Sequence, residues 1–278
     1  MTRVYGIQIG MVVANQEEFD RYINSLVKSE KLGLMVDIDG TISPIAPAPA
    51  VASVSPRCHE ALSVLSERLP LTAIVTGRDI HDARRMIDLP RLIYIGNHGL
   101  EEWRDGQSII LPQAARFAHR IPDALRRVES QVHIDGMIFE NKGVTASIHY
   151  RLTPDPIAAR NQVMTALEPL ADIFDLKVTE GEMVIEIKPP IDYDKGDAVE
   201  RLANTHNLTG VIFLGDDKPD VGAFQAVRRM RESGLPGLAI VVTRDETPEE
   251  VTSEADWKLN TVRGTEDFLF NLLDVYKI

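Results

Sequence analysis

The chain has 278 residues, a hydrophobic share of 44% and a formal net charge of −12. This length can bury a core without disulfides, and the single cysteine, Cys58, permits no disulfide within the chain, as is usual in a reducing compartment. The strong negative charge disfavours nucleic acid and anionic membranes as partners. It does not exclude a small anionic substrate, because a few local cations are enough to hold one phosphate.

No run of residues predicts a membrane span or a clear signal peptide. Every apolar run is shorter than the about 20 residues that cross a bilayer. The weakly apolar stretch 4–13 lacks a small-residue cleavage site. We therefore expect a cytoplasmic protein that binds neither nucleic acid nor membrane.

Helical and strand patterns alternate through the first hundred residues. Short apolar runs of strand length are separated by segments with apolar residues at helical spacing. This alternation predicts βαβ units and a parallel sheet. The expected elements are a helix over 15–28, a strand over 32–36, a helix over 56–68, a strand over 71–75, a helix over 79–88 and a strand over 92–95.

The middle of the chain has a different pattern, in which each helix is followed by two strands. Such a pattern is typical of an α+β domain with antiparallel pairing, and it ends at Pro189-Pro190. The expected elements are a helix over about 113–131, strands over 137–140 and 144–151, a helix over 155–171, and strands near 174–178 and over 183–188.

The α/β pattern then resumes to the end of the chain, with helices over 195–206 and about 264–276 and strands over 211–214 and 238–242. The whole chain is thus expected to be an α/β protein whose parallel-sheet core is interrupted by an inserted α+β domain. The predicted divisions are an N-terminal extension with a helix (1–28), a core domain (29–112 and 191–278) and the insertion (113–190).

Two aspartates, Asp37 and Asp39, stand directly after the buried strand expected over 32–36. An aspartate has an unperturbed pKa of about 3.9, so Asp37 is ionised and can attack phosphorus to form an aspartyl phosphate. In an extended chain Asp39 points to the same side, where it can protonate the leaving oxygen and then activate water. Gly40 allows a tight turn beside the phosphate.

Other polar residues follow further strands or the insertion. Lys195 can neutralise phosphoryl oxygens, and the Thr76 hydroxyl can donate a hydrogen bond to one of them. Magnesium binds about six oxygens, often one or two carboxylates together with substrate and water. The candidate protein ligands are Asp37, the backbone carbonyl of Asp39, Asp216 and, directly or through water, Asp220.

Each cluster, taken alone, also has a purely structural explanation. Asp-X-Asp-Gly and Thr76-Gly77 are common in turns, and a lone lysine such as Lys195 is usually solvated. Gly215-Asp216-Asp217 could be a loop or the N-cap of a helix. Their joint occurrence in this order, at the ends of predicted strands, favours a phosphoryl-transfer site.

The same residues resemble the four motifs of the haloacid dehalogenase superfamily. The resemblance implies a Rossmann-like parallel-sheet core with an inserted α+β cap that closes over the substrate. It also implies that Asp37 is the nucleophile, Asp39 the acid/base, Thr76 and Lys195 phosphate ligands, and Asp216 and Asp220 magnesium ligands. The matching segments are Asp37-Ile38-Asp39-Gly40-Thr41, Thr76, Lys195 and Gly215-Asp216-Asp217-Lys218-Pro219-Asp220.

A narrower resemblance, over about residues 30–276, is to the trehalose-6-phosphate phosphatases. It implies trehalose 6-phosphate as the substrate and Mg²⁺ as the cofactor. The segments that carry it are Gly96-Asn97-His98-Gly99-Leu100-Glu101, Glu140-Asn141-Lys142-Gly143, Ser147-Ile148-His149-Tyr150-Arg151, and Glu186-Ile187-Lys188-Pro189 ahead of Asp194-Lys195-Gly196.

Charged residues of the insertion suit a sugar, because carboxylates accept hydrogen bonds from hydroxyl groups while lysine and arginine donate them. Glu140 and Lys142 alternate onto one face of a predicted strand, as His149 and Arg151 do on the next. Each could instead be a solvated charge or part of an ion pair. Residues 97–98 could likewise do no more than cap a turn. The predicted substrate-binding residues are Gly77, Arg78, Asn97, His98, Glu140, Lys142, His149, Arg151 and Glu186.

Three positions depart from the pattern that is frequent in these phosphatases. Pro219 stands where threonine is common, Val221 where glutamate is common, and Glu182 where the cap loop often has lysine. The acidic residues are kept, so these departures bear on sugar specificity rather than on magnesium binding.

The alternative functions are a phosphatase for sucrose, mannosylglycerate or glucosylglycerate phosphate, a phosphomutase, and a non-catalytic sugar-phosphate sensor. We expect a monomer or small oligomer; association with a trehalose-phosphate synthase is a further hypothesis.

Overall fold

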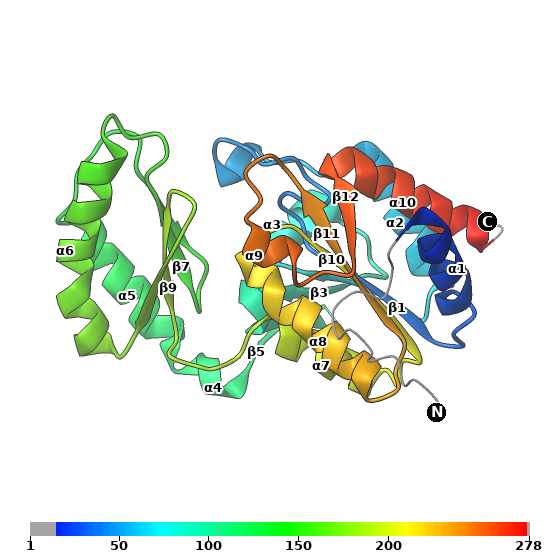
Figure 1. The fold of residues 1–278 in the computed structure, drawn as a ribbon. Helices are drawn as coiled ribbons and strands as arrows, with labels where there is room; N and C mark the ends of the chain where they lie inside the picture. The colour runs from blue at the N-terminus through cyan, green and yellow to red at the C-terminus, as the bar shows by residue number, and fades with distance from the viewer. Residues whose placement is uncertain (1–14, 105, 277–278) are drawn as a thin grey trace, which may run out of the picture.

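Eight strands form the central sheet in the computed structural model, which describes residues 15–104 and 106–276 (Figure 1). Their order is β12-β11-β10-β1-β2-β3-β4-β5. The strands from β12 to β3 run parallel, and β4 and β5 add an antiparallel hairpin at one edge. Residues 1–14 of the predicted N-terminal extension lie outside the described residues. The strands are β1 (Leu32–Val36), β2 (Leu71–Val75), β3 (Ile93–Gly96), β4 (Glu101–Arg104), β5 (Gln107–Ile110), β10 (Gly210–Gly215), β11 (Gly237–Thr243) and β12 (Trp257–Asn260).

Helices cover both faces of this sheet, which is why its central strands are continuous apolar runs. Along β1, Leu34 and Val36 pack against α1, α2, α3 and α10, while Met35 packs against α7 and α8. The helices are α1 (Gln16–Leu26), α2 (Pro56–Arg68), α3 (Ile80–Ile87), α7 (Lys195–Thr205), α8 (Val221–Glu232), α9 (Glu249–Thr252) and α10 (Thr261–Val275), with 3₁₀ turns η1 (Pro49–Val51), η2 (Asn97–Gly99) and η3 (Lys218–Asp220).

A second, antiparallel sheet of order β6-β7-β9-β8 forms the inserted domain, at the left of Figure 1. Ala146 and Ile148 of β7 pack against the cap helices α5 and α6, so the alternate residues Ser147 and His149 lie on the opposite face. That face turns toward the core domain (Figure 1). The elements are α4 (Pro112–Ala115), α5 (Phe117–Glu129), β6 (Ile138–Asn141), β7 (Ala146–His149), α6 (Pro156–Phe174), β8 (Lys177–Gly181) and β9 (Val184–Lys188).

The predicted α/β fold class is confirmed, and the differences lie at edges and element ends. The hairpin β4–β5 and the strand β12 were not predicted, because they lack a continuous apolar run, and the edge strands β5 and β12 are also partly exposed. The strand expected near 174–178 begins instead at Lys177, because α6 continues to Phe174 and ends on Asp175 in the left-handed conformation (φ 57°). The helix expected over 113–131 is divided into α4 and α5 at Arg116.

Helix α1 packs on the core rather than standing apart. The Phe19 ring stacks on Trp257 of β12 with 4.4 Å between ring centroids, and the Tyr22 hydroxyl donates a hydrogen bond to the Gly237 carbonyl (3.1 Å).

The boundaries of the core domain (29–112 and 191–278) and of the insertion (113–190) stay a prediction. None of the helices in the described residues combines the length and apolar character that crossing a bilayer requires.

Candidate active site

Three adjacent parallel strands bring the predicted catalytic loops together. Asp37 follows β1, Thr76 follows β2 and Asp216 follows β10, and β10, β1 and β2 are neighbours in the sheet. The carboxyl ends of parallel strands meet at one edge, which is where open α/β sheets bind ligands. The three strands end at nearly the same level, since Val36 of β1 lies opposite Leu214 of β10 and Ile74 of β2.

Lys195, the first residue of α7, joins two of the acidic residues. Its Nζ lies 3.0 Å from Asp37 Oδ1 and 2.7 Å from Asp220 Oδ1, and the lysine is only 2% exposed. Burial alone would lower the lysine pKa, but the two carboxylates raise it above its ordinary value. Lys195 is therefore a fixed positive charge beside Asp37.

Three buried carboxylates crowd around one point. Ligand oxygens of Asp37, Asp216 and Asp220 all lie within 4.8 Å of one another. Burial raises the pKa of Asp37 to about 7, with Lys195 opposing and the neighbouring carboxylates adding to the shift. The pKa of Asp216 is raised well above its usual value, again by burial first and then by the nearby carboxylates.

This cluster fits a hard divalent cation. The oxygen ligands are of the type that magnesium prefers, and a bound cation would offset the repulsion that raises these pKa values. Asp37 Oδ1 is buried and lies 3.0 Å from Lys195 Nζ, and a carboxylate oxygen with one such contact keeps a lone pair for a metal ion. Gly40 makes room for the cluster, because a Cβ on it would lie 1.9 Å from Asp216 Oδ2 and its φ of +76° disfavours other residues.

Thr76 directly follows β2, and its hydroxyl has a hydrogen that the described contacts do not use. Its Oγ1 accepts a hydrogen bond from the Arg78 backbone N–H (3.2 Å), so its own hydrogen is left for another acceptor, and the residue is 1% exposed. The predicted phosphate ligands Thr76 and Lys195 thus flank the sheet edge from β2 and α7.

The side chain of Asp39 points to a different partner from that of Asp37. Both of its carboxylate oxygens accept hydrogen bonds from the Arg78 guanidinium, Oδ2 from Nε (2.7 Å) and Oδ1 from Nη2 (2.8 Å). The carboxylate of Asp39 is therefore separate from the buried cluster of Asp37, Asp216 and Asp220. Metal binding through its backbone carbonyl stays a prediction.

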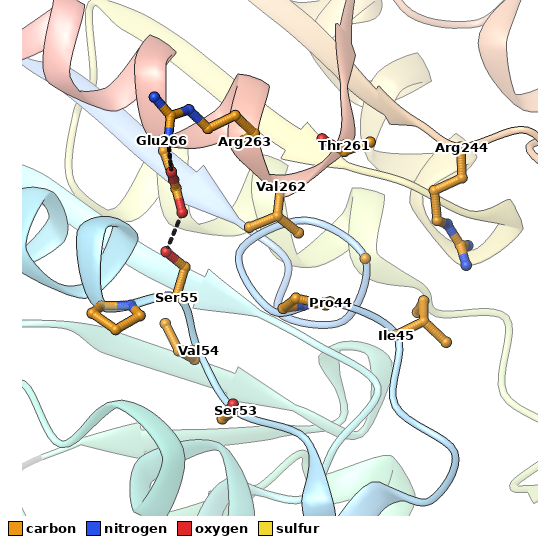
Figure 2. A pocket seen from close by; sticks show the side chains of 12 residues that line it. Pro44, Ile45, Ser53, Val54, Ser55, Arg244, Thr261, Val262, Arg263 and Glu266 are labelled. Atoms are coloured by element: carbon orange, nitrogen blue, oxygen red, sulfur yellow. Dashed lines mark hydrogen bonds and ion pairs between the residues drawn. The ribbon is translucent and has the colours of Figure 1, made fainter.

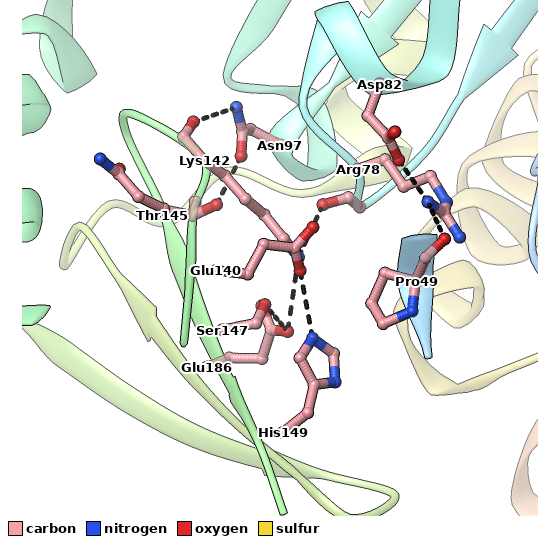
Figure 3. Close-up of polar contacts among 12 residues, drawn as sticks. Pro49, Arg78, Asp82, Asn97, Glu140, Lys142, Thr145, Ser147, His149 and Glu186 are labelled. Carbon is pink, nitrogen blue, oxygen red and sulfur yellow. Dashed lines mark hydrogen bonds and ion pairs between the residues drawn. The ribbon is translucent and has the colours of Figure 1, made fainter. Parts of the chain in front are cut away.

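Four predicted substrate residues meet on the core-facing side of the cap sheet (Figure 3). Glu140 Oε2 lies 3.1 Å from His149 Nε2 and 3.6 Å from Lys142 Nζ. Lys142 Nζ also lies 3.8 Å from Glu186 Oε1 and donates to the Gly77 carbonyl of the core (3.4 Å). The cap therefore presents two carboxylates, a lysine and a histidine to the loop that follows β2.

Asn97 and His98 connect the core to this cap surface. The fully buried Asn97 side-chain amide donates to the Lys142 carbonyl (3.0 Å) and to Glu101 Oε2 (2.8 Å), and it accepts a hydrogen bond from Thr145. His98 Nε2 lies 3.6 Å from Glu186 Oε2, and burial lowers the His98 pKa to about 4. Asn97 therefore holds the cap hairpin, whereas the neutral His98 lies between Glu186 of the cap and the loop at Gly77.

Glycine at position 77 lets the loop lie against the His98 ring. A Cβ added there would meet the ring at 2.5 Å. By contrast, Arg151 is paired with Glu182 at the β8–β9 turn (3.0 Å), and both residues are exposed. Arg151 is thus not brought together with the other predicted cap residues, and Glu182, one of the departures, neutralises it.

Sequence reasoning missed Arg244, whose Nη2 donates to Asp216 Oδ2 (2.9 Å). Arg244 directly follows β11, so the same rule of strand ends that located Asp216 could have found it. Together with Gly40 it borders a cavity of about 590 Å³ between the segment after β1 and the start of α10 (Figure 2). The remaining lining residues are Pro44, Ile45, Ser53, Val54, Ser55, Pro56, Thr261, Val262, Arg263 and Glu266.

A parallel α/β core with a buried acidic cluster at its carboxyl edge and an inserted α+β cap defines a phosphatase of the haloacid dehalogenase type. The trehalose-phosphatase family model matches residues 35–263. The chain belongs to this family and is a phosphoric monoester hydrolase.

Individual relatives agree with this assignment. Trehalose-phosphate phosphatase B of Arabidopsis thaliana is 30% identical over 272 residues, which are 92% of this chain and 70% of the relative. Probable trehalose-phosphate phosphatase 3 of Oryza sativa subsp. japonica is 28% identical over 276 residues, 91% of this chain and 72% of the relative. The crystal structure of a trehalose-6-phosphate phosphatase related protein superposes with a TM-score of 0.74 at 25% identity, covering 89% of this chain and 100% of that one. The C-terminal domain of trehalose-6-phosphate phosphatase from C. albicans shares the fold, with a TM-score of 0.74 at 22% identity over 95% of this chain and 99% of that one.

Proposed function

We propose that this chain hydrolyses trehalose 6-phosphate to trehalose and phosphate, with Asp37 as the nucleophile. The observation that carries the substrate proposal is the group of Glu140, Lys142, His149 and Glu186, which faces the core loops from the cap (Figure 3). Carboxylates accept hydrogen bonds from sugar hydroxyls, and the lysine donates to them. The names of the relatives support the same substrate.

In the first step, an Asp37 carboxylate oxygen forms a bond to phosphorus as the bond between phosphorus and the sugar oxygen breaks. Asp39 transfers a proton to the leaving sugar oxygen, which departs as an alcohol. Lys195 and the Thr76 hydroxyl hold the phosphoryl oxygens, at positions that suit charge stabilisation during the transfer. The products of this step are trehalose and an aspartyl phosphate on Asp37.

In the second step, Asp39 removes a proton from water, and the water oxygen attacks phosphorus. The bond between phosphorus and the Asp37 oxygen breaks, which releases phosphate and regenerates the carboxylate. Mg²⁺ held by Asp37, Asp216 and Asp220 would neutralise the negative charge that phosphate adds to this buried acid cluster.

The setting of the reaction is part of the same proposal. The one cysteine, Cys58, is free and buried, which agrees with a reducing cytoplasm. A trehalose-phosphate synthase would supply the substrate, so an association with such an enzyme, by a monomer or small oligomer, remains a hypothesis.

The test is phosphate release from a panel of sugar phosphates in the presence of magnesium. We expect trehalose 6-phosphate to have the highest kcat/KM, and Asp37→Asn to reduce turnover by roughly 10⁴-fold or more, because the covalent route is lost. Equal or better turnover of sucrose, mannosylglycerate or glucosylglycerate phosphate would refute the substrate proposal.

Two other outcomes of the panel separate the remaining alternatives. An isomerised sugar phosphate in place of free phosphate would identify a phosphomutase. Saturable binding of trehalose 6-phosphate without any product would identify a sensor. Appreciable residual activity of Asp37→Asn would contradict the assignment of the nucleophile.

A further inference from the structure

The Arg78 guanidinium is almost entirely occupied by protein acceptors. The residue is 6% exposed. Nε and Nη2 donate to Asp39, and Nη1 donates both to the Pro49 carbonyl (3.3 Å) and to Asp82 Oδ2. These four contacts use four of the five N–H groups that a guanidinium carries. A phosphate would therefore find only one free donor on Arg78 unless its existing hydrogen bonds broke.

The geometry of the Arg78–Asp39 pair is the planar, two-bond arrangement that arginine forms with carboxylates. Its two bonds of 2.7 and 2.8 Å set both the position and the plane of the Asp39 carboxylate. Each carboxylate oxygen keeps a second acceptor position, so this arrangement leaves Asp39 able to carry a proton. Arg78 thus determines the direction from which Asp39 can meet the leaving group.

Asp82 holds Arg78 from the other side. It lies in the first turn of α3, where its backbone N–H donates to the helix N-cap Asp79 (3.0 Å), so its position is set by a regular helix. Its second carboxylate oxygen accepts a hydrogen bond from Arg85, whose side chain is 62% exposed. Asp82 is therefore a rigidly mounted anchor, and Arg85 is only a peripheral partner of it.

Arg78 also fixes the segment that follows the nucleophile. Its bond to the Pro49 carbonyl reaches η1, ten residues beyond Asp39, and Figure 3 shows Pro49 and Asp82 on either side of the guanidinium. One side chain therefore holds the acid/base residue, the loop after it and helix α3 in one arrangement.

We propose that Arg78, anchored by Asp82, is the positioning residue for the acid/base Asp39, and that it does not bind the substrate phosphate. This inference rests on the proposed role of Asp39 as proton donor. It assigns a function to Asp82, which no motif singled out, and it changes the substrate-binding role that was predicted for Arg78.

The test compares two leaving groups. A sugar oxygen must be protonated to leave, whereas p-nitrophenolate leaves without a proton, so the first step needs a correctly placed Asp39 only for the sugar phosphate. The second step needs Asp39 for both substrates, so the two activities compared are the single-turnover rates at which sugar and p-nitrophenolate are released. Since a positioned general acid contributes roughly 10²–10⁴-fold, we expect Arg78→Gln to lower the single-turnover rate of sugar release by about 100-fold and Asp82→Asn by about 10-fold. For p-nitrophenyl phosphate we expect losses of less than about 3-fold, and KM for the sugar phosphate should stay within about 3-fold of the wild type.

Arg85→Gln is the matched control, because it removes an arginine from the same Asp82 carboxylate without touching Asp39, and it should keep the wild-type ratio of the two activities. Thermal melting checks that each variant folds. Because Asp82→Asn preserves the size of its side chain, it tests the inference even if Arg78→Gln does not fold.

Asp39→Asn separates this inference from the proposed function. If Asp39→Asn loses sugar-phosphate activity selectively while Arg78→Gln and Asp82→Asn lose neither activity selectively, the inference is wrong and the proposed mechanism stands. If Asp39→Asn loses both activities equally, the proton-donor role of Asp39 fails, and the inference fails with it. A rise in KM for both substrates in Arg78→Gln would mean that Arg78 binds phosphate. If trehalose 6-phosphate is not hydrolysed, the alkyl phosphate with the highest turnover in the panel takes its place.

Discussion

Charged side chains at the carboxyl edge of the sheet are held in opposite-charge contacts before any substrate arrives. Lys195 contacts Asp37 and Asp220, Arg244 contacts Asp216, and Arg78 contacts Asp39. Preorganised charges of this kind need little rearrangement during phosphoryl transfer, which is the main source of catalysis in such reactions. The three buried carboxylates of Asp37, Asp216 and Asp220 nevertheless outnumber the two cations, Lys195 and Arg244, that contact them. Without a bound metal ion, repulsion among these carboxylates therefore remains.

The repulsion among the three carboxylates leads to a prediction for Asp216→Asn, which removes one of the negative charges beside Asp37. The folded-state pKa of Asp37 is raised from 3.8 to about 7, so without metal this carboxylate costs stability as the pH rises through that window. At pH 7.5, magnesium should therefore raise the melting temperature, by an amount equivalent to about 2.7 kcal/mol at 100 times its Kd. Asp216→Asn should melt higher than the wild type without metal and should lose most of the magnesium-dependent shift.

Differential scanning fluorimetry with a magnesium titration, after treatment with chelator, measures both effects. Asp217→Asn is the matched control, since the neighbouring carboxylate lies outside the group of ligand oxygens. An unchanged magnesium shift in Asp216→Asn would show that the metal binds elsewhere.

At the scale of elements, strands that are buried on both faces could be predicted and edge strands could not. The runs at Leu32–Val36 and Leu71–Val75 are fully buried, and their apolar sequence is sufficient to identify them. The hairpin β4–β5 depends on pairing with β3, which a local pattern does not contain. The proposed catalytic acids could be located because they directly follow such buried strands. Asp82 could not, because its proposed role depends on a partner from another loop.

The connection between η2 and the β6–β7 hairpin leads to a prediction for the cap. Asn97 has a positive φ of 51°, which asparagine and aspartate tolerate, so Asn97→Asp keeps the backbone while losing the amide hydrogen bonds to the Lys142 carbonyl and Glu101. The new carboxylate would also lie beside Glu101. Since an unsatisfied buried group costs about 1–3 kcal/mol, we expect KM for the sugar phosphate to rise by about 10-fold or more, with a smaller change for p-nitrophenyl phosphate, which has no sugar for the cap to bind.

Steady-state kinetics with the two substrates measure this difference. Thr145→Ser, which keeps the hydroxyl that donates to Asn97, is the control and should resemble the wild type. A parallel rise in KM for both substrates would place the effect of Asn97 on the phosphate site rather than on the cap.

At the scale of the whole molecule, the cap and α1 lie on opposite sides of the core domain (Figure 1). The cap contacts the core through polar groups near the catalytic loops, such as Lys142 with the Gly77 carbonyl. Helix α1 instead makes apolar contacts, through Phe19, with β12 and with Phe268 of α10. The apolar contacts of α1 and the polar contacts of the cap thus lie at opposite ends of the molecule.

This separation predicts that weakening α1 lowers stability but leaves catalysis intact. Phe19 is 6% exposed and stacks on Trp257, so Phe19→Ala should cost about 3 kcal/mol, in the range for deleting a buried aromatic ring. Thermal melting should show a lower transition temperature, while kcat and KM measured well below that transition should match the wild type. Glu17→Ala, an exposed change on the same helix, should alter neither property. A loss of kcat in Phe19→Ala, with the protein still folded, would instead mean that the far edge of the sheet is coupled to the catalytic loops through β11 and Arg244.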